Sequence, residues 1–431
     1  MSIEELYQIF SKYPVVSTDS RHIEPNALFF ALKGDNFNGN RYASIALETG
    51  ASYAVIDDAD YDLGKGYILV DDVLTTLQQL ASFHRLKLAL PVIAITGTNG
   101  KTTTKELITS VLSKKFTVTA TKGNLNNHIG VPLTLLSMNE KTEIGVVEMG
   151  ANHPGEIAAL CNIAEPDFGL ITNVGKAHLE GFGSFEGVKK TKAELYRFIE
   201  HKRGKIFINS ANNQLKEMAG SVETIGYRTG REGYGIEGEV VNSSPFLAFK
   251  AKFPKGWLYI KTNVAGGYNL ENAMAAVSIG NYFGVAPHDI CDAIQSYIPA
   301  NNRSQFVKTR SNQILMDAYN ANPTSMDAAL ENFKTFDASL KGVILGDMFE
   351  LGESAREEHQ QIVNKLETMD DLSFILLTGR EFSECQVSGR INVFQDNESL
   401  IGYLESLEPQ GYLILIKGSR GMKLENVAAQ L

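Results

Sequence analysis

The chain has 431 residues, which is too long for one ordinary core and enough for about three domains. Its 43% hydrophobic content is typical of a globular protein that can bury sizeable cores. The net charge of −10, from 40 basic and 50 acidic residues, excludes a global field that would attract nucleic acid or an anionic membrane. Anionic ligands would therefore have to be bound by local groups.

The cysteines and the N-terminus indicate the compartment. Cys161, Cys291 and Cys385 lie far apart, without metal-ligand or disulfide spacing. The first ten residues are acidic and have helical apolar spacing, unlike a signal peptide, and no apolar run approaches the roughly 20 residues that cross a bilayer. We expect a cytoplasmic monomer with reduced cysteines, which neither binds nucleic acid nor inserts into a membrane.

Residues 1–88 alternate short strands with helical patterns and predict a small α/β N-terminal domain. The strands are expected at 27–32, 53–56 and 67–70, and the helices at 42–49 and 74–88. One turn in this domain gathers hydroxyls, a carboxylate and an arginine that could bind a phosphate or a sugar: Ser17, Thr18, Asp19, Ser20 and Arg21. A plain surface turn explains that composition equally well.

The stretch 91–106, PVIAITGTNGKTTTKE, predicts a phosphate-binding loop between a strand and a helix. Gly97 and Gly100 permit a tight turn whose N–H groups can point at one anion, and the helix N-terminus near Thr102 adds more donors. Lys101 can reach the outer phosphates, and the Thr102 hydroxyl can bind Mg²⁺. The strict loop pattern has glycine where this chain has Ile95, and the alternative is an ordinary strand–helix turn.

From 89 to 297 strands and helices alternate, which predicts a central P-loop domain with a doubly wound, mostly parallel sheet. Further strands are expected at 116–120, 144–148, 168–172 and 206–209. Residues 234–265 instead predict a small antiparallel hairpin, and two helices, at 270–283 and 286–297, close the domain. In such sheets ligands bind at the carboxyl ends of the strands.

Several polar side chains follow those strand ends. Glu148 ends an apolar strand and is placed to hold Mg²⁺ beside the phosphates, although an ordinary strand end remains open. His178 follows the next strand, where a metal or phosphate role and a structural loop role are equally open. Helix 186–199 carries three lysines, a pattern that usually forms a solvated face. Asn269 and Asn272 begin a helix, where they could cap it or read a base edge.

Residues 298–431 predict a third, Rossmann-like α/β domain after a linker at 299–302. Its strands are expected at 314–318, 342–345, 374–377 and 412–416, and its helices at 325–333, at 354–368 and from 420. The loop after the first strand is rich in hydrogen-bonding groups, which favours a ligand: Asp317, Tyr319, Asn320 and Asn322. LIKGSRGM offers a second anion site near the C-terminus through Lys417, Ser419 and Arg420.

Seven segments together resemble the Mur ligases, in order and over all three domains: GTNGKTTTKE, VVEMGA, ITNVGKAHLEGFGS, the lysine of TKAEL, GYNLENAMAA, DAYNANPTSM and KGSRGM. DAYNANPTSM, GNLNNHIGVPLTLL and LGDMFELGE are the most specific and match the members that add D-alanyl-D-alanine to UDP-N-acetylmuramoyl-tripeptide. The third-domain signature of the sister ligase that adds the third amino acid is absent.

The resemblance implies an ATP-dependent amide ligase of peptidoglycan precursor synthesis that acts through an acyl phosphate. Residues 1–88 would bind the UDP-sugar through the 17–21 turn and Lys33, and Asn124 and Asn127 would face the sugar-peptide. Residues 298–431 would close over the nucleotide and bind the incoming dipeptide. The residues implied for ATP are Gly97, Thr98, Asn99, Gly100, Lys101, Thr102, Thr103, Asn269, Asn272, Arg303, Asp317, Tyr319 and Asn322.

The resemblance also implies two Mg²⁺ ions and a modified lysine. Thr102, Glu148 and His178 would hold Mg²⁺, together with a CO₂-derived carbamate on Lys192, and Lys101, Lys192 and His178 would be the catalytic residues. Two motifs depart from the family pattern. The usual Gly-x-His-Asn reads Gly-Gly-Tyr-Asn around Tyr268, and Arg303 follows an asparagine where glycine is common.

Three alternatives remain open at this point. A sister Mur ligase or a folylpolyglutamate-type ligase would use another amine substrate. A non-catalytic nucleotide-binding module would bind ATP without turnover and would not need Glu148, His178 and Lys192 around the phosphates.

Overall fold

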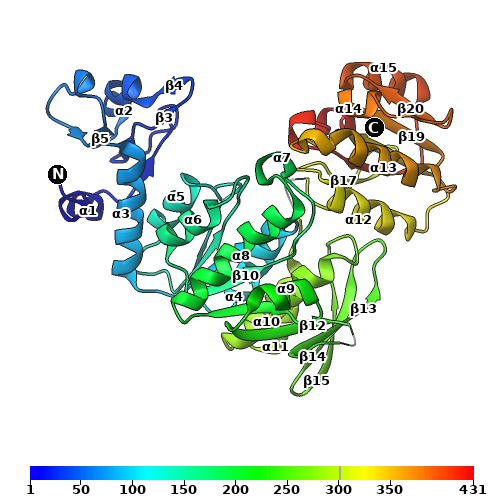
Figure 1. Ribbon diagram of the computed structural model, residues 1–431, viewed down its shortest axis with the longest axis horizontal. Helices are drawn as coiled ribbons and strands as arrows, with labels where there is room; N and C mark the ends of the chain where they lie inside the picture. Colours follow the sequence, from blue (N-terminus) through cyan, green and yellow to red (C-terminus); the bar gives the residue numbers. More distant parts are fainter. Residues whose placement is uncertain (231, 300–301) are drawn as a thin grey trace.

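The computed structural model describes residues 1–230, 232–299 and 302–431, which form three lobes in chain order. The first lobe (blue) and the third lobe (yellow to red) stand at opposite ends of the middle lobe (Figure 1). The predicted α/β class is confirmed, with largely parallel sheets and an antiparallel extension. Of the predicted linker 299–302, residues 300 and 301 lie outside the described residues.

The first lobe contains a parallel sheet in the order β1-β2-β5-β6. Its strands are β1 (Val16–Ser17), β2 (Leu28–Phe30), β5 (Tyr53–Ile56) and β6 (Tyr67–Leu69), with a separate antiparallel pair β3 (Lys33–Gly34) and β4 (Phe37–Asn38). Its helices are α1 (Ile3–Lys12), α2 (Ala43–Thr49) and α3 (Val73–Leu88), with 3₁₀ turns η1 (Gly39–Tyr42) and η2 (Ala59–Tyr61). Helix α1 confirms the helical apolar spacing of the first ten residues, and a capping box of Ser2 and Glu5 starts it.

Helix α3 joins the first lobe to the middle lobe through packing. Its buried Leu77 and Leu80 belong to one apolar core that continues into Val131 and Leu135 of α5 (Gly130–Leu136) and Leu160 of α6 (Glu156–Ala164). Figure 1 shows α3 standing beside these two helices. The first and middle lobes are therefore held by a shared apolar core.

The sheet of the middle lobe has the order β15-β14-β13-β12-β11-β10-β7-β9-β8. Neighbouring strands are parallel from β8 to β13, and the β14–β15 pair forms the predicted antiparallel hairpin. The strands are β7 (Val92–Thr96), β8 (Val118–Ala120), β9 (Ile144–Glu148), β10 (Phe168–Ile171), β11 (Lys205–Asn209), β12 (Glu223–Thr229), β13 (Ile236–Asn242), β14 (Ala248–Phe253) and β15 (Gly256–Lys261). The sequence did not predict β12 or β13.

Helices cover both faces of this sheet, as a doubly wound fold requires (Figure 1). They are α4 (Lys101–Leu112), α5, α6, α7 (Leu179–Phe182), α8 (Phe185–His201), α9 (Asn213–Ala219), α10 (Asn269–Tyr282) and α11 (Pro287–Ser296). Strand β7 lies between β9 and β10, so the carboxyl ends of these three buried strands share one edge. Gly97, Glu148 and Thr172 therefore lie at the same edge of the sheet.

The sheet of the third lobe has the order β16-β17-β21-β18-β19-β20, antiparallel only at the β16–β17 pair. Its strands are β16 (Gln305–Lys308), β17 (Gln313–Asp317), β18 (Lys341–Gly346), β19 (Phe374–Thr378), β20 (Ile391–Phe394) and β21 (Leu413–Lys417). Its helices are α12 (Pro323–Lys334), α13 (Ala355–Glu367), α14 (Arg380–Ser383), α15 (Asn397–Leu407) and α16 (Glu425–Ala428), with the 3₁₀ turn η3 (Gly352–Ser354). The helix expected from Arg420 is instead the 3₁₀ turn η4 (Arg420–Met422), followed by α16.

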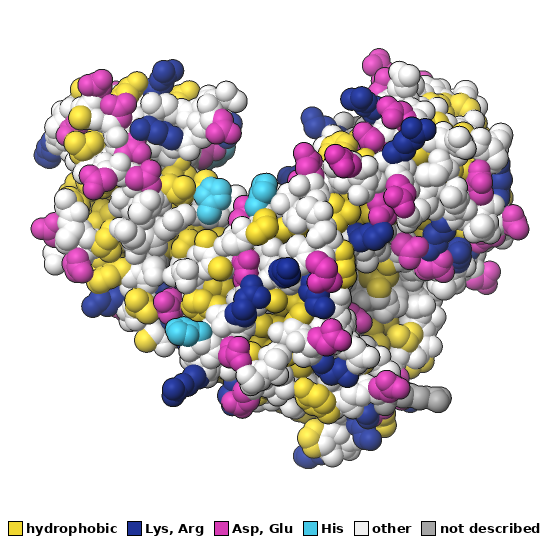
Figure 2. Space-filling model, in the orientation of Figure 1, with side chains coloured by type: hydrophobic (Ala, Val, Ile, Leu, Met, Phe, Trp, Pro, Cys, Tyr) yellow, Lys and Arg dark blue, Asp and Glu magenta, His cyan; other side chains and the backbone are white. Residues whose placement is uncertain are grey.

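The space-filling view shows the molecule hollowed between the first and third lobes, above the middle lobe (Figure 2). Such a hollow has room for an extended ligand that touches more than one lobe. No helix in the described part of the chain is long and apolar enough to cross a membrane.

Candidate nucleotide and metal site

The loop between β7 and α4 has the shape of a phosphate cradle, and two glycines make that shape possible. Gly97 has φ +144°, and a Cβ there would lie 2.0 Å from Thr172 Oγ1. Gly100 has φ +78°, and a Cβ there would lie 2.5 Å from Asn272 Oδ1. No larger residue fits either position without moving these neighbours. The loop is thus pressed between the end of β10 and helix α10 and leads directly into α4.

Lys101 is folded back onto this loop. Its Nζ donates to the carbonyls of Gly97 (2.8 Å) and Thr98 (3.1 Å). The pKa of Lys101 is lowered to about 8, chiefly by burial and also by the charge of Arg303, while the charge of Glu148 acts in the opposite direction. The ammonium is therefore still mostly charged at neutral pH, and it is centred over the loop where a phosphate would bind.

Glu148 ends β9 and is brought next to Thr102, as the strand order predicts. Its side chain is 1% exposed, and its Oε1 accepts hydrogen bonds from Thr102 Oγ1 (3.3 Å) and Asn126 Nδ2 (2.8 Å). No described residue donates a hydrogen bond to Oε2, and the nearest cation, Lys105 Nζ, lies 3.9 Å away. A buried carboxylate oxygen without a donor is a suitable ligand for a hard divalent cation.

His178 faces the third lobe. It lies at the start of α7 with φ +51°, and its Nδ1 lies 2.5 Å from Glu350 Oε2 in the segment between β18 and α13. This ion pair holds the pKa of Glu350 below its usual value. No contact joins His178 to Thr102 or Glu148 among the described residues. Of the four predicted metal ligands, the structure therefore brings Thr102 and Glu148 together and pairs His178 with a carboxylate of another lobe.

Lys192 lies inside the middle lobe, on α8. Its side chain is 2% exposed, and its Nζ lies 5.5 Å from the ring centroid of Phe182. The contact that the described residues offer this Nζ is the aromatic ring of Phe182, not a carboxylate. Burial and the nearby charge of Lys101 lower the pKa of Lys192 well below its ordinary value. Both effects favour the neutral amine, which is the nucleophilic form of lysine.

The other two lysines of α8 lie toward the protein surface. Lys190 is exposed, and Lys189 forms a 3.5 Å ion pair with the exposed Glu217. The burial of Lys192 therefore distinguishes it from the lysines that surround it in the sequence.

Asn269 and Asn272 are buried and bonded to each other. Thr104 Oγ1 donates to Asn272 Oδ1 (3.0 Å), Asn272 Nδ2 donates to Asn269 Oδ1 (2.7 Å), and Asn269 Nδ2 donates to the Ala265 carbonyl (2.7 Å). Neither amide caps α10, so capping does not explain them. The chain of bonds instead fixes α10 against α4 and places Asn272 against Gly100.

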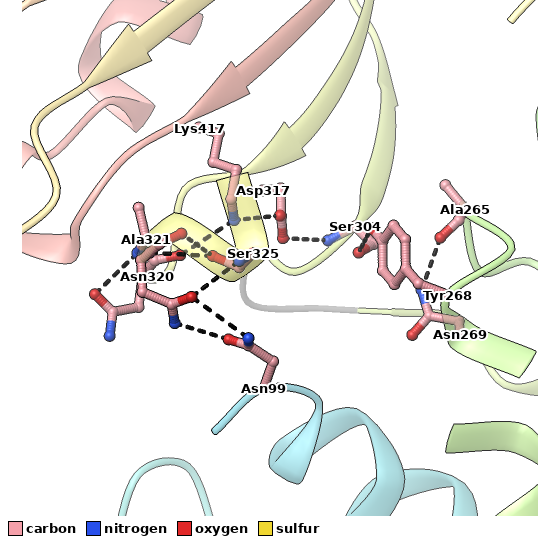
Figure 3. A network of polar contacts seen from close by, with 11 residues as sticks. Asn99, Ala265, Tyr268, Asn269, Ser304, Asp317, Asn320, Ala321, Ser325 and Lys417 are labelled. Atoms are coloured by element: carbon pink, nitrogen blue, oxygen red, sulfur yellow. Dashed lines mark hydrogen bonds and ion pairs between the residues drawn. The ribbon is translucent and has the colours of Figure 1, made fainter. Parts of the chain in front are cut away.

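In the third lobe, Asp317 and Lys417 form a pair at the ends of β17 and β21. Lys417 Nζ lies 2.6 Å from Asp317 Oδ2 and also donates to the Asn320 carbonyl at 3.3 Å. Figure 3 shows this pair beside Ser304, whose N–H donates to Asp317 Oδ1 at 3.1 Å. The charge of Lys417, one of the two cations predicted for a second anion site, is thus neutralised within the lobe. Ser419 is likewise engaged, since its Oγ accepts from the Phe349 N–H.

Tyr319 contacts two arginines, Arg303 and Arg420. The guanidinium carbon of Arg303 lies 3.5 Å from the Tyr319 ring centroid, and Arg420 Nη1 donates to the Tyr319 hydroxyl at 3.2 Å. Arg303 Nε is buried and has no hydrogen-bond partner among the described residues. The three residues come from separate segments of the third lobe and present a cationic surface around one aromatic ring.

Asn322 connects the third lobe to the phosphate loop. Its Nδ2 donates to Asn99 Oδ1 at 2.8 Å, and Asn99 Nδ2 lies 3.4 Å from Asn322 Oδ1. Nearby, Lys176 Nζ forms a 2.6 Å ion pair with Glu358 of the third lobe. The third lobe therefore contacts the very loop that would hold the phosphates.

The residues predicted for the UDP-sugar lie in the first lobe and in the loop before α5. Arg21 forms a two-bond ion pair with Asp19 (2.9 and 2.7 Å), and Ser17 Oγ bonds backbone carbonyls within the same turn, which also contains Thr18 and Ser20. Lys33 Nζ lies 2.8 Å from Oδ1 of Asp57, whose side chain is 6% exposed. Asn127 Oδ1 accepts the N–H groups of Ile129 and Gly130 and so starts α5, whereas Asn124 is exposed. The structure does not bring this group into contact with the phosphate loop.

Sequence reasoning missed several residues that support the loop. Asn173, directly after β10, accepts the Asn99 N–H on its Oδ1 (3.0 Å) and donates to the Asn99 carbonyl (3.1 Å). Thr121 Oγ1 accepts the N–H of Glu148 (2.9 Å), and Asn126 bonds the carboxylate itself. The one available signal was their position just after strands whose carboxyl ends meet at the site.

This donor set fits a metal that is shared with a nucleotide. Within the described residues, no three His, Cys, Asp or Glu side chains cluster as a metal site. Mg²⁺ is usually bound through one or two carboxylates plus substrate phosphates and waters. Glu148 and Thr102, at the edge of a phosphate cradle, match that requirement.

Three family models match the chain in order. The model "Mur ligase family, catalytic domain" matches residues 12–85, "Mur ligase middle domain" matches 95–280, and "Mur ligase, glutamate ligase domain" matches 302–420. The chain is 36% identical to the UDP-N-acetylmuramoyl-tripeptide–D-alanyl-D-alanine ligase of Bacillus subtilis, over 96% of this chain and 92% of that protein.

Solved structures agree with these matches. The crystal structure of MurF from Acinetobacter baumannii superposes with a TM-score of 0.86 and 31% identity, over 100% of this chain and 98% of that one. MurF ligase from Thermotoga maritima, in complex with ADP, superposes with a TM-score of 0.84 and 26% identity, over 96% of each chain.

Proposed function

The chain belongs to the Mur ligase family and is an ATP-dependent ligase that joins D-alanyl-D-alanine to UDP-N-acetylmuramoyl-tripeptide, and we propose how its residues divide this reaction. The observation that supports the division is that three features meet on one loop. They are the Lys101 ammonium, the Thr102–Glu148 pair and the third-lobe residue Asn322. We take the domains as residues 1–88, 89–297 and 298–431.

Ligation requires activation of a carboxylate, which is a poor electrophile. The terminal carboxylate of the tripeptide attacks the γ-phosphate of ATP, forming an acyl phosphate and releasing ADP. The amine of the dipeptide then attacks the acyl carbon, and phosphate leaves. Lys101 and the N–H groups of residues 97–103 hold the phosphates and neutralise the charge that moves during transfer. Asn269 and Asn272 keep α10 against the loop on the adenine side of ATP, and Arg303, Asp317 and Tyr319 complete the nucleotide site from the third lobe.

The unpartnered oxygen of Glu148 and the Thr102 hydroxyl would hold Mg²⁺ next to the phosphates. When bound, Mg²⁺ supplies positive charge that stabilises the transferred phosphoryl group. His178 would serve a second Mg²⁺ together with Lys192, and in that case it must exchange its contact with Glu350 for the metal.

Lys192 would serve this second Mg²⁺ as a carbamate. Its neutral amine attacks the carbon of CO₂, a proton leaves the nitrogen, and the product carries a negative charge. Burial supports this step because it favours the neutral, nucleophilic amine. The product would place an anion near Lys101, where the free ammonium is repelled.

The remaining assignments concern the substrate-binding lobes, the oligomeric state and the cellular compartment. The first lobe would bind the UDP end through residues 17–21 and Lys33, with Asn124 and Asn127 along the sugar-peptide, and the hollow between the lobes would hold the extended substrate. The third lobe would bind the dipeptide. We propose a monomer that works in the cytoplasm.

The test is an incubation with ATP, Mg²⁺, UDP-N-acetylmuramoyl-tripeptide and D-alanyl-D-alanine, in which ADP and the pentapeptide product are measured. The expected result is equal formation of both, abolished in Lys101→Ala. Absence of the pentapeptide while a single amino acid stimulates ADP release would reassign the chain to another ligase of the superfamily. ATP binding without any turnover would make it a nucleotide-binding module.

A further inference from the structure

Arg303 lies in an unusual turn. Its two neighbours, Asn302 and Ser304, have φ values of +55° and +45°. Asparagine tolerates this left-handed region better than most residues, but serine rarely adopts it. Two such residues around one arginine need support from surrounding groups, because the backbone alone does not favour the conformation.

That support comes from both sides of Ser304, which is buried. Its N–H donates to Asp317 Oδ1 at 3.1 Å, and Asp317 is fixed by Lys417 Nζ at 2.6 Å. Its Oγ shares a 2.8 Å hydrogen bond with the hydroxyl of Tyr268. Tyr268 directly precedes α10 of the middle lobe, so this bond joins two lobes (Figure 3).

The turn places the Arg303 guanidinium on the ring of Tyr319, in the loop that follows β17. The guanidinium is stacked on Tyr319, its Nε has no partner among the described residues, and its charge acts on Lys101 in the phosphate loop. A buried guanidinium donor without an acceptor, close to another cation, is arranged for an anion such as a phosphate.

We propose that Tyr268 is a positioning residue for ATP, whose hydroxyl acts through Ser304 to hold the turn that aims Arg303 at the phosphates. Tyr268 is itself one departure from the family pattern, and Ser304 follows Arg303 directly after the other, Asn302; in the structure Tyr268 and Ser304 contact each other. Tyr268 is 36% exposed, so packing of the ring alone does not fix the position of its hydroxyl. The inference rests on one part of the proposed function, namely that ATP binds at this site.

The experiment is a double-mutant cycle of Tyr268→Phe and Ser304→Ala. Affinity for a non-hydrolysable ATP analogue with Mg²⁺ is measured by calorimetry without the other substrates, and kcat and KM are measured in the full reaction. We expect each single variant to weaken analogue binding and to raise the KM for ATP by about five- to tenfold, with kcat within about twofold of wild type. The double variant should be no weaker than the weaker single variant.

Tyr7→Phe is the matched control, because it removes a tyrosine hydroxyl that lies 3.3 Å from His84 Nδ1, away from the site. It should bind the analogue like the wild type. Wild-type affinity in Tyr268→Phe, additive losses in the double variant, or an equal rise in KM for all three substrates would each overturn the inference. If the variants change analogue binding as expected but the wild type does not ligate, the proposed function is overturned and this inference stands. If the wild type ligates and Tyr268→Phe binds the analogue with unchanged affinity, this inference is overturned and the proposed function stands.

Discussion

Asn322 bonds two different parts of the molecule with one amide. Its Oδ1 accepts the Ser325 N–H at 2.9 Å and so caps α12, while its Nδ2 donates to Asn99 in the phosphate loop at 2.8 Å. The start of a third-lobe helix and the shape of the loop are therefore linked through a single side chain.

Asn322→Asp separates these two roles. Aspartate is as good a cap as asparagine, but it has no N–H to give Asn99. We expect the melting temperature to stay within about 2 °C of wild type and the KM for ATP to rise at least about fivefold, because one hydrogen bond is lost and a negative charge is added beside the phosphates. Asn322→Ala should lose the cap as well and cost about 1 kcal/mol of stability. An unchanged KM for ATP in both variants would contradict a role for the Asn99 contact.

Lys192→Ala should lower the ligation rate at least about 100-fold, because the site would lack an anion to offset its cations. Small carboxylic acids should restore part of the rate by occupying the space of the carbamate. With ¹³C-labelled bicarbonate, the wild type should show a carbamate resonance that Lys192→Ala lacks. Lys190→Ala, an exposed lysine of the same helix, is the control and should behave like the wild type. Inactivity without rescue or resonance would exclude the carbamate.

Glu148→Gln should abolish the extra thermal stability that Mg²⁺ gives the ATP-bound protein. In the wild type, ATP with Mg²⁺ should raise the melting temperature well above the value with ATP and EDTA, since a ligand of the folded state stabilises it. In Glu148→Gln this difference should largely vanish, with ligation reduced about 100-fold or more. Glu140→Gln, which changes an exposed carboxylate near the same strand, should retain both. A full Mg²⁺-dependent shift in Glu148→Gln would remove this carboxylate from the metal site.

Asp57→Asn should destabilise the first lobe in a pH-dependent manner. Burial acts to raise the pKa of Asp57, but hydrogen bonds from Lys33, Asn40 and a backbone N–H lower it below its usual value. Because the folded pKa is the lower one, this carboxylate stabilises the fold fully above about pH 4 and loses its contribution as the pH falls through the folded value.

Denaturant melts of Asp57→Asn should therefore show a loss of about 1 to 2 kcal/mol at pH 7 that disappears in strong acid. The exposed Asp35→Asn in the same lobe is the control and should show no such difference. A loss that is constant with pH would indicate a packing defect instead of a lost charge.

The phosphate loop and the Thr102–Glu148 pair could be predicted because their chemistry is local. Strand, glycine turn and helix follow each other in the sequence, and parallel strand order brings neighbouring carboxyl ends together. The contact between His178 and Glu350 could not be predicted, since it depends on how the third lobe sits on the middle one. For the same reason, Asn322 was assigned to a ligand loop, but its bond to Asn99 was not foreseen.

Strands β12 and β13 were missed because their sequences do not show clear alternation. In β12, ETIGYRT, only Tyr227 is fully buried, and β13 is half-buried or exposed over most of its length. Gly226 is required there by the close approach of Tyr234. Such strands gain their stability from their neighbours in the sheet, which a single sequence does not reveal.

The apolar core that α3 shares with the middle lobe also determines which fragments of the chain can fold alone. A fragment that ended near residue 90 would carry the apolar side of α3, including Leu77 and Leu80, without the helices that cover it, and we expect it to aggregate. Polar bonds such as Asn99–Asn322 and Lys176–Glu358 are prominent where the third lobe meets the middle one, and water can replace them. A fragment of residues 1–299 should therefore remain folded, so limited proteolysis should release the third lobe before it separates the first.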